Sequence, residues 1–272
     1  MARFLSDQEF KQFRDIIYNE SGIHFSESNR TILESRLKER LRKTKIESIG
    51  EYHSLIKKDK DELKTLLDTV TTNLTRFFRN TLHFQTLESY VIPDLIQYKK
   101  KNGQNSLRVW SAGCSTGEEP YSIAMVLKDK VPPGIKSEVV ASDLSLKSLM
   151  TAKEGFYAEN KVSGVPEKYL KRFFEQKDSG YQVKDEIKQM VKFDYHNLKF
   201  DSGQRNLDII FCRNVIIYFD EAAQKSVIEK FYESLNNHSY LFIGHSESLF
   251  GMKTKFEFHK TDWAVVYRKF ME

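Results

Sequence analysis

The sequence lacks the long apolar runs that membrane proteins need. No stretch among its 272 residues approaches the roughly 18 apolar residues that span a bilayer. The start, residues 1–7, also lacks the long apolar core of a signal peptide. We therefore expect a cytoplasmic protein.

Cysteine is scarce as well, since Cys114 and Cys212 are the only two in the chain. Two cysteines cannot build a disulfide framework or a cysteine-rich zinc site, and we expect no bound metal. Both follow or end predicted strands. We expect them to be small residues that line a pocket rather than catalytic thiols, because no histidine partner is close to them in sequence.

What the chain does contain suits a globular protein of two domains, with 40% hydrophobic and 30% charged residues. Residues 1–80 carry only helical patterns and are predicted as a helical N-terminal domain. Residues 81–106 are predicted as a helical connector that ends in a polar break. Residues 107–272 alternate strand and helix patterns and form the second predicted domain.

Helix signals in the first domain are specific. Ser6 and Glu9 form a capping box before an apolar helical pattern, and Gly22 is a typical stop. Further helices are predicted at about 27–45, 52–57 and 61–79.

A glycine turn after the first predicted strand points to a ligand. The apolar run 107–112 leads into a turn with Gly113 and Gly117, whose backbone could approach a ligand closely. No lysine follows Gly117, which excludes a phosphate-binding loop, and Glu118 and Glu119 would repel a polyphosphate. S-adenosylmethionine, with a ribose diol and positive charge, fits better. The alternative is a plain turn whose carboxylates favour the helix dipole.

A second strand pattern supports this interpretation. Residues 138–143 are a short apolar strand that begins about 25 residues after the turn and ends in Asp143. An acidic residue there can accept both ribose hydroxyls. Alternatively Asp143 caps the helix predicted at 144–153, in competition with Ser145.

The remaining patterns complete an α/β fold. Further strands are predicted at 206–213 and 239–244, a helix at 220–235, and a terminal strand pair at 256–259 and 264–267. We expect a doubly wound, Rossmann-like parallel sheet with helices on both faces and a C-terminal antiparallel hairpin. The long stretch 155–192 is predicted as a small inserted β subdomain.

Four segments carry a family resemblance: 71–79, 111–122, 211–219 and 244–249. In content and order they resemble the chemotaxis receptor methyltransferases of the CheR family. The resemblance covers nearly the whole chain. It implies a bacterial enzyme that transfers a methyl group from S-adenosylmethionine, leaving S-adenosylhomocysteine, to glutamate carboxylates of methyl-accepting chemotaxis receptors. In that family the inserted subdomain can dock a receptor peptide, which the residues here do not reveal.

The resemblance also implies site residues. It places Arg79 and Tyr218 near the transferred methyl group. It implies cofactor contacts, besides those of Arg79 and the turn at Gly113, for a set from several segments: Asn73, Thr75, Glu118, Asp143, Asn197, Leu198, Arg213 and Asn214. A glutamate acceptor is already ionised at neutral pH, so no general base is required. His245 and Glu247 are accordingly interpreted as structural.

The helix predicted at 27–45 concentrates positive charge. From Arg30 to Lys45 the chain has seven lysines and arginines and two glutamates, a surplus of five, which equals the net charge of the whole chain. A solvated helix face is one explanation. The other is a surface for an acidic partner, which by resemblance is the methylation helix of a receptor. The candidates are Arg36, Arg40, Arg42 and Lys43.

Two rival functions remain open at this stage. One is a cofactor-binding regulatory module without turnover, against which Arg79 and Tyr218 argue. The other is a nucleic-acid methyltransferase, although the chain has no motif for holding a base amino group and no aromatic stacking motif beside the basic run. We expect no nucleic-acid partner, a monomer, and contact with the membrane only through the receptor.

Overall fold

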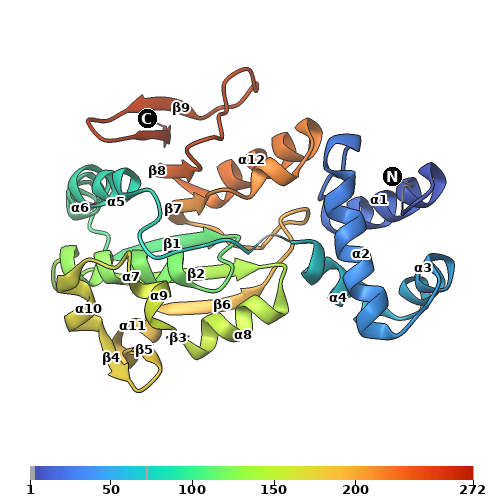
Figure 1. Cartoon of the computed structure of the whole chain (residues 1–272). Helices are drawn as coiled ribbons and strands as arrows, with labels where there is room; N and C mark the ends of the chain where they lie inside the picture. Colours follow the sequence, from blue (N-terminus) through green and yellow to red (C-terminus); the bar gives the residue numbers. More distant parts are fainter. Residues whose placement is uncertain (1–3, 72, 272) are drawn as a thin grey trace.

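The computed structural model describes residues 4–71 and 73–271. The positions outside it include Thr72, within the first of the four motifs, and the first three residues of the chain. A helical part and a larger part built on a sheet lie side by side (Figure 1). Within the described residues, no helix combines the length and apolarity needed to cross a membrane.

The helical part begins as the sequence predicts. Ser6 caps the first helix with both bonds of the capping box, and Gly22 ends it at a positive φ of 78°. Its elements are α1 (Asp7–Ser21), η1 (Glu27–Asn29), α2 (Arg30–Thr44), α3 (Ile49–Lys58) and α4 (Lys60–Val70). Their apolar faces share one core, which includes Phe13, Leu37 and Leu66.

The last predicted helix of this part is shorter than expected. It was predicted to reach about residue 79, but α4 ends at Val70. Leu74, which lies within the predicted helix, is 74% exposed. The chain leaves the helix because Phe77 and Phe78 are buried in the core of the other part.

Helices α5 (Thr81–Thr86) and α6 (Ile92–Lys101), joined by the π-helical turn η2 (Leu87–Val91), pack onto the sheet. The strands of this sheet are β1 (Ser106–Ala112), β2 (Lys136–Asp143), β6 (Val191–Tyr195), β7 (Leu207–Cys212), β8 (Leu235–Ile243), β9 (Glu257–Lys260) and β10 (Val265–Phe270). Their order is β6-β2-β1-β7-β8-β10-β9. The first five are parallel, whereas β10 is antiparallel to both β8 and β9.

Residues alternate between the two faces of the sheet, and each face has its own core. Val109 and Phe211 point into the core under α5, α6 and α7 (Glu118–Lys130), whereas Trp110 and Ile210 point into the core under α12 (Glu221–Ser234). Helix α8 (Leu146–Glu154) packs on β2 and β6. The expected α/β sheet with helices on both faces and a terminal hairpin is confirmed.

The inserted β subdomain is present as well. It is a three-stranded sheet, ordered β3-β5-β4, from β3 (Phe156–Tyr157), β4 (Phe174–Lys177) and β5 (Gly180–Val183). Three short helices accompany it: α9 (Glu159–Val162), α10 (Glu167–Phe173) and α11 (Asp185–Lys188).

The strand order places a topological switch between β1 and β7. From β1 the chain proceeds outward to β2 and then β6, and it later returns to the other side of β1 to add β7 and β8. Ligands of open α/β sheets bind at such a point, outside the carboxyl ends of the strands. The helical part lies at this end of the sheet (Figure 1).

Main-chain bonds join the two parts. Ile23, just after α1, forms an antiparallel bridge with Phe219, and the amide of His24 donates to the carbonyl of Tyr218 over 2.8 Å. The side chain of Asn197 donates to the carbonyl of Glu20 at the end of α1 over 2.7 Å. The position of Tyr218 is therefore set by both parts.

Candidate functional site

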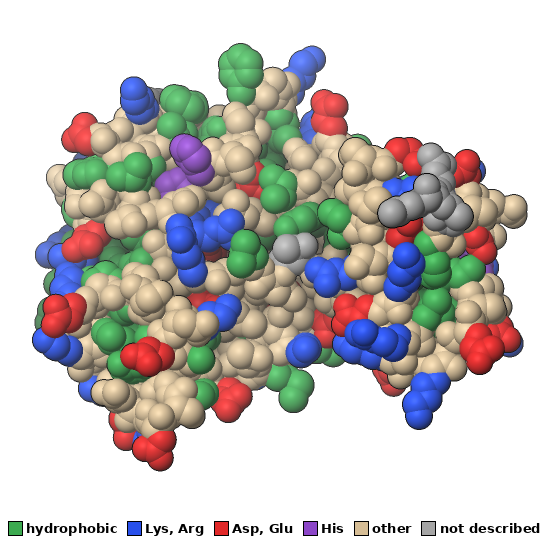
Figure 2. All heavy atoms as spheres, in the orientation of Figure 1, with side chains coloured by type: hydrophobic (Ala, Val, Ile, Leu, Met, Phe, Trp, Pro, Cys, Tyr) green, Lys and Arg blue, Asp and Glu red, His purple; other side chains and the backbone are tan. Residues whose placement is uncertain are grey.

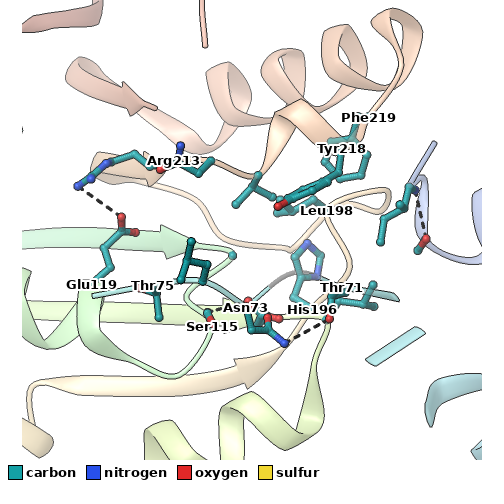
Figure 3. A pocket seen from close by; sticks show the side chains of 18 of the residues that line it. Thr71, Asn73, Thr75, Ser115, Glu119, His196, Leu198, Arg213, Tyr218 and Phe219 are labelled. Carbon is teal, nitrogen blue, oxygen red and sulfur yellow. Dashed lines mark hydrogen bonds and ion pairs between the residues drawn. The ribbon is translucent and has the colours of Figure 1, made fainter. Parts of the chain in front are cut away.

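A cavity lies where the carboxyl ends of β1, β2, β6 and β7 face the helical part (Figure 3). Its lining comes from segments far apart in the sequence. It includes Ser21, Ile23, Val70, Asn73, Leu74, Thr75, Arg76, Arg79, Gly113, Ser115, Glu119, Asp143, Leu144, His196, Asn197, Leu198, Arg213, Asn214, Val215, Tyr218 and Phe219. Three of the four sequence motifs, 71–79, 111–122 and 211–219, contribute lining residues, whereas 244–249 does not.

Asp143 lies at the end of β2 and faces the cavity. Its two carboxylate oxygens accept the backbone N–H groups of Ser115, at 2.7 Å, and Ser145, at 2.8 Å. The cap of α8 is Ser145, whose hydroxyl accepts from Ser148. Burial raises the pKa of Asp143, and the two amide bonds partly offset this by favouring the carboxylate. Asp143 thus fixes the glycine turn and keeps further lone pairs toward the cavity.

The two glycines of the turn are needed for close packing against protein. Gly113 has a φ of 83°, and a Cβ there would lie 2.4 Å from a methyl group of Val215. Gly117 has a φ of 94°, and a Cβ would lie 2.8 Å from the Tyr157 hydroxyl. Gly113 lines the cavity, but Gly117 does not. The expectation that both allow a ligand to approach applies at most to Gly113.

The adjacent glutamates at the start of α7 differ in environment. Glu118 is fully buried, accepts from the Thr116 hydroxyl over 2.6 Å and does not line the cavity. Glu119 does line it, accepts from Ser111 over 2.7 Å and lies 3.6 Å from the guanidinium of Arg213. The family resemblance favoured Glu118, whereas the cavity presents Glu119 (Figure 3).

Arg213 extends from the end of β7 into the cavity. Its side chain is 1% exposed. One terminal nitrogen donates to the carbonyl of Arg79, whereas Nε and Nη1 have no hydrogen-bond partner among the described residues. Burial lowers its pKa, and Glu119 partly offsets this. Buried N–H groups without partners are uncommon and need a ligand or water.

The loop after Arg213 is organised by Glu247. The carboxylate of Glu247 accepts backbone N–H bonds from Gly244, Asn214, Val215 and Ile217, the last three at 2.9, 3.0 and 3.3 Å. Because its hydrogen bonds hold the backbone of this loop, Glu247 has a structural role, as expected from the sequence. It holds the turn that leads to Tyr218.

His245, the neighbour of Glu247 in the same motif, is exposed and does not line this cavity.

Arg79 reaches the cavity from the segment that links the two parts. Phe77 meets Tyr157 edge-on at 4.8 Å between ring centroids, and the amide of Phe78 donates to Ser122 over 3.0 Å. These two buried anchors fix the segment. One nitrogen of Arg79 donates to the carbonyl of Leu74 over 2.8 Å, within the same segment.

Tyr218 and the residues after β6 form the other side of the cavity. Tyr218 ends the turn η3 (Ile216–Tyr218) and packs against the core of the helical part. Leu198 is buried. The side-chain amide of Asn197 donates to the carbonyl of Glu20 and accepts from the backbone N–H of Lys199. His196 lies beside them, with Nε2 buried and without a partner.

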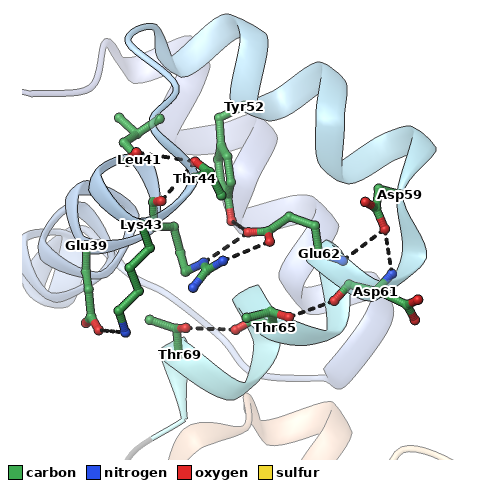
Figure 4. Close-up of polar contacts among 11 residues, drawn as sticks. Glu39, Leu41, Lys43, Thr44, Tyr52, Asp59, Asp61, Glu62, Thr65 and Thr69 are labelled. Atoms are coloured by element: carbon green, nitrogen blue, oxygen red, sulfur yellow. Dashed lines mark hydrogen bonds and ion pairs between the residues drawn. The ribbon is translucent and has the colours of Figure 1, made fainter.

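The basic helix differs from the expectation of a uniform charged face. Arg40 is buried and donates two bonds to Glu62, at 3.0 and 2.8 Å. Tyr52 donates a third bond to the same carboxylate, and Figure 4 shows Tyr52 and Glu62 side by side. Arg30 is buried too, and its ion pairs include Glu34. These arginines hold the helical part together, so Arg40 is not available to a partner.

Other cations of α2 remain at the surface. Arg42 and Lys43 are exposed and Arg36 is half-buried; Glu39 lies 2.6 Å from Lys43 and 3.8 Å from Arg36. Figure 2 shows Lys and Arg side chains in a broken band across the middle of this face, from the sheet part to the helical part.

The structure therefore brings together most of the residues expected at the site. Asn73, Thr75, Arg79, Gly113, Asp143, Asn197, Leu198, Arg213, Asn214 and Tyr218 line one cavity, whereas Glu118 does not. Sequence reasoning missed Glu119, Ser115 and His196 as cavity residues. Cys114 and Cys212, expected at a pocket, are buried in the cores, and burial raises the pKa of both thiols.

Two family models match the chain. The model described as "CheR methyltransferase, all-alpha domain" matches residues 8–71, and "CheR methyltransferase, SAM binding domain" matches residues 73–265. The second match agrees with the fold class expected from the sequence.

Several curated proteins are similar over nearly their full length. The chemotaxis protein methyltransferase of Borreliella burgdorferi is 40% identical over 260 residues, which cover 92% of this chain and 91% of that protein. Chemotaxis protein methyltransferase 2 of Vibrio cholerae is 34% identical, over 90% of this chain and 87% of that protein. The chemotaxis protein methyltransferase of Escherichia coli is also 34% identical, with 93% and 88% covered.

Proposed function

The chain belongs to the CheR methyltransferase family, and from this membership we propose that it methylates glutamate side chains of methyl-accepting chemotaxis receptors. The methyl donor is S-adenosylmethionine and the product on the receptor is a glutamate methyl ester. The observation that carries the proposal is the single cavity at the switch point, where Asp143 and Arg213 of the sheet meet Arg79 and Tyr218.

The residues of the cavity fit this donor. Nε and Nη1 of Arg213, Oδ1 of Asn214 and Oγ of Ser115 are buried without hydrogen-bond partners among the described residues. A ligand with a carboxylate and several hydroxyl groups would satisfy such donors and acceptors. Glu119 and Asp143 supply negative charge, which suits a cationic ligand.

Each part of the cavity has a proposed task. Asp143 accepts the ribose hydroxyls on lone pairs left free by its two amide bonds. Arg213 and Asn214 hold the amino-acid end of the ligand. Asn73, Thr75 and Leu198 close the cavity around it.

The chemistry asks for alignment rather than proton transfer. S-adenosylmethionine supplies a methyl group activated by a sulfonium. A glutamate carboxylate, with a pKa near 4.3 in model peptides, arrives ionised and needs no base. Arg79 holds the carboxylate with its remaining N–H groups, and Tyr218 orients it by a hydrogen bond. The remaining contribution to the rate comes from the exclusion of water from the cleft.

The receptor reaches this site as an acidic helix, steered by the positive charge of the face in Figure 2. The contributors on α2 are Arg36, Arg42 and Lys43, without Arg40. The enzyme acts as a cytoplasmic monomer that meets the membrane only through the receptor, and nucleic acid is not a partner.

One experiment tests the proposal. The protein is mixed with methyl-labelled S-adenosylmethionine and membranes that carry the receptors of the source organism. We expect label on receptor-sized bands that base treatment releases, as methyl esters require. The Arg79→Lys variant serves as the matched control. Label that resists base, or label on nucleic acid with a steep salt dependence, would replace this function with another.

The basic surface has its own test. Changing Arg36, Arg42 and Lys43 to glutamate is expected to slow receptor methylation more than ten-fold at low ionic strength, because electrostatic steering is lost. Affinity for S-adenosylhomocysteine, measured by calorimetry, stays unchanged. The control reverses three exposed lysines on neighbouring helices, Lys57, Lys58 and Lys60. Equal rates in the two triple variants would reduce the α2 charges to a solvated face.

A further inference from the structure

A second hollow lies beside the cofactor cleft, and the proposed chemistry does not use it. It opens between the start of α5, the end of β8 and the turn that joins β9 to β10. The hydroxyls of Thr86 and Thr261 lie 3.2 Å apart and tie this turn to α5, so the hollow is a fixed part of the fold. Its lining includes Asn80, Leu82, Ile243, Phe258, Trp263 and Val265.

The hollow exposes apolar surface at its edge. Leu82 is 54% exposed and Phe258 is 64% exposed, although both line it, and Trp263 is half-buried. Figure 2 shows hydrophobic side chains gathered over α5 and the neighbouring hairpin. An apolar patch with a polar rim is typical of a protein interaction site, and aromatic residues are enriched there. The exposed polar residues of the rim are His245, Ser248, Lys260 and Asp262.

The hollow and the cofactor cleft share a boundary. Arg79 lines the cleft, and the next residue, Asn80, lines the hollow. Asn214 lines the cleft too, and its backbone N–H donates over 2.9 Å to Glu247, which lines the hollow. The hollow therefore begins directly beside Arg79, the residue that we propose holds the acceptor carboxylate.

The shape of the acceptor decides what covers this surface. An α-helix with its side chains is about 10–12 Å wide, so only the glutamate side chain enters the cleft and the helix itself stays outside. With that glutamate at Arg79, the neighbouring turns of the helix cover the surface on either side. The helical part with its basic α2 lies on one side, and α5 with the hollow lies on the other (Figure 1). Side chains three, four and seven positions from the glutamate share its face of the helix and point toward this surface.

Resting on the proposed function, we propose that the hollow docks the receptor helix by holding an apolar side chain, three to seven residues from the methylated glutamate, against Leu82, Phe258 and Trp263. Lys260 and Asp262 on the rim have opposite charges, so the hollow binds through apolar burial. The basic surface of α2 attracts the same helix by its charge. Apolar anchors at such spacings are the usual way in which a groove binds a helix.

Steady-state kinetics with receptor-bearing membranes test this docking. Leu82→Ser combined with Phe258→Ser removes two anchors at exposed positions, and thermal unfolding checks that the fold survives. We expect the KM for the receptor to rise at least five-fold, since interface contacts are lost. The kcat and the affinity for S-adenosylhomocysteine should stay unchanged, because the lost binding is common to the ground state and the transition state. The matched control changes Leu146 and Met150 of α8, which are 46% and 73% exposed, to serine and should keep the wild-type KM.

Salt separates the hollow from the charges of α2. Apolar burial is not screened by ions, so the rise in KM should persist at high ionic strength. The effect of reversing the α2 charges should shrink under the same conditions. A rise in KM that disappears with added salt would contradict apolar docking.

Disulfide crosslinking locates the receptor helix. Cys114 and Cys212 are buried, so Phe258→Cys supplies the reactive thiol. We expect crosslinks to receptor cysteines placed three, four or seven residues from the methylated glutamate, on one side of it. Cysteines two or five residues away point from the opposite face of the helix and should not react. Crosslinks between two copies of the variant, in place of crosslinks to the receptor, would assign the hollow to self-association and overturn the inference.

The outcomes distinguish this inference from the function on which it rests. No methylation of receptors by the wild-type protein would overturn the proposed function. Receptor methylation with an equal KM in the wild type and in the double serine variant of Leu82 and Phe258 would overturn the docking role of the hollow alone.

Discussion

Two buried arginines, Arg40 in the helical part and Arg213 in the cleft, show how the same side chain serves different ends. Arg40 donates two bonds to Glu62, whose carboxylate also accepts from Tyr52. Arg213 is more deeply buried, yet two of its nitrogens have no partner among the described residues. A satisfied buried charge is part of the fold, whereas an unsatisfied one marks a place for a ligand.

The two sites differ because of what the neighbouring elements supply. Glu62 lies in the first turn of α4, directly across from Arg40 on α2. Arg213 has Glu119 at 3.6 Å, too far for a hydrogen bond, and Arg79 nearby adds like charge. The helical part therefore satisfies the buried charge of Arg40 with its own residues. The cleft leaves the guanidinium of Arg213 only partly satisfied, which costs stability.

The largest expected effect is at Arg40. Arg40→Met leaves the largely buried Glu62 carboxylate with the Tyr52 hydroxyl but without its positive partner, and should lower the free energy of unfolding by about 3–5 kcal/mol. Chemical denaturation measures this. The double variant Arg40→Met with Glu62→Leu should recover most of the loss, and Arg42→Met at the surface should stay within about 0.5 kcal/mol of wild type. A tolerant Arg40→Met would mean that the pair is not structural.

Arg213 should give the reverse pattern. Arg213→Met should weaken binding of S-adenosylhomocysteine by about 1.5–3 kcal/mol, the range for hydrogen bonds to a charged group. The ligand-free protein should lose less stability than Arg40→Met does, because fewer satisfied bonds disappear. Calorimetry and denaturation on the same sample give both numbers. Stability and affinity falling together by similar amounts would erase the distinction between the two arginines.

Arg79 tests whether the cleft arginines share one task. Arg79→Lys keeps the charge but loses the planar fork, and should reduce turnover ten-fold to a hundred-fold with a modest change in cofactor affinity. Tyr218→Phe should cost less, since it removes one neutral hydrogen bond.

The pH dependence of Arg79→Lys and Tyr218→Phe is a further check. Neither variant should gain a new dependence near neutrality. A wild-type rate that follows one ionisation at pH 6–7 and disappears in His245→Ala would restore a general base.

The open charge of the cleft also acts on His83. Burial, and after it electrostatic interaction with Arg213 and His245, lowers the pKa of His83 to about 4. The pKa of an unperturbed histidine is 6.5. Between about pH 4 and pH 6.5, His83 therefore binds a proton in the unfolded chain but not in the folded protein, so stability falls as the pH falls.

We expect His83→Phe to remove this loss. Relative to the variant, wild type should lose about 2 kcal/mol between pH 7 and pH 5, as read from denaturant midpoints at each pH. Parallel curves for the two proteins would contradict the lowered pKa.

Much of the fold could be predicted because local signals agree with the final structure. The capping box at Ser6, the glycine stop at Gly22 and the continuous apolar run of β7 each specify an element without help from distant residues. The end of α4 could not be predicted, since no glycine or proline marks it. It is set by the burial of Phe77 and Phe78 in the other part of the molecule.

The site was less predictable for a geometric reason. Glu118 and Glu119 are adjacent on one helix, and a rotation of about 100° per residue decides which faces the cavity. His196 carries no motif, and its free nitrogen is visible only once Asp143 and β6 are placed. Arg40 and Arg42 look alike in sequence, but only one lies opposite Glu62.

The bridge between Ile23 and Phe219 has a mechanical consequence. With the His24 amide bonded to the Tyr218 carbonyl, the helical part cannot swing away without breaking main-chain bonds or dragging the tyrosine with it. The opening of the cleft therefore has a fixed width, because the two parts do not move apart and together around it. Under the proposed function, the acceptor must carry its carboxylate on a side chain narrow enough to enter this opening, as a glutamate protruding from a helix does.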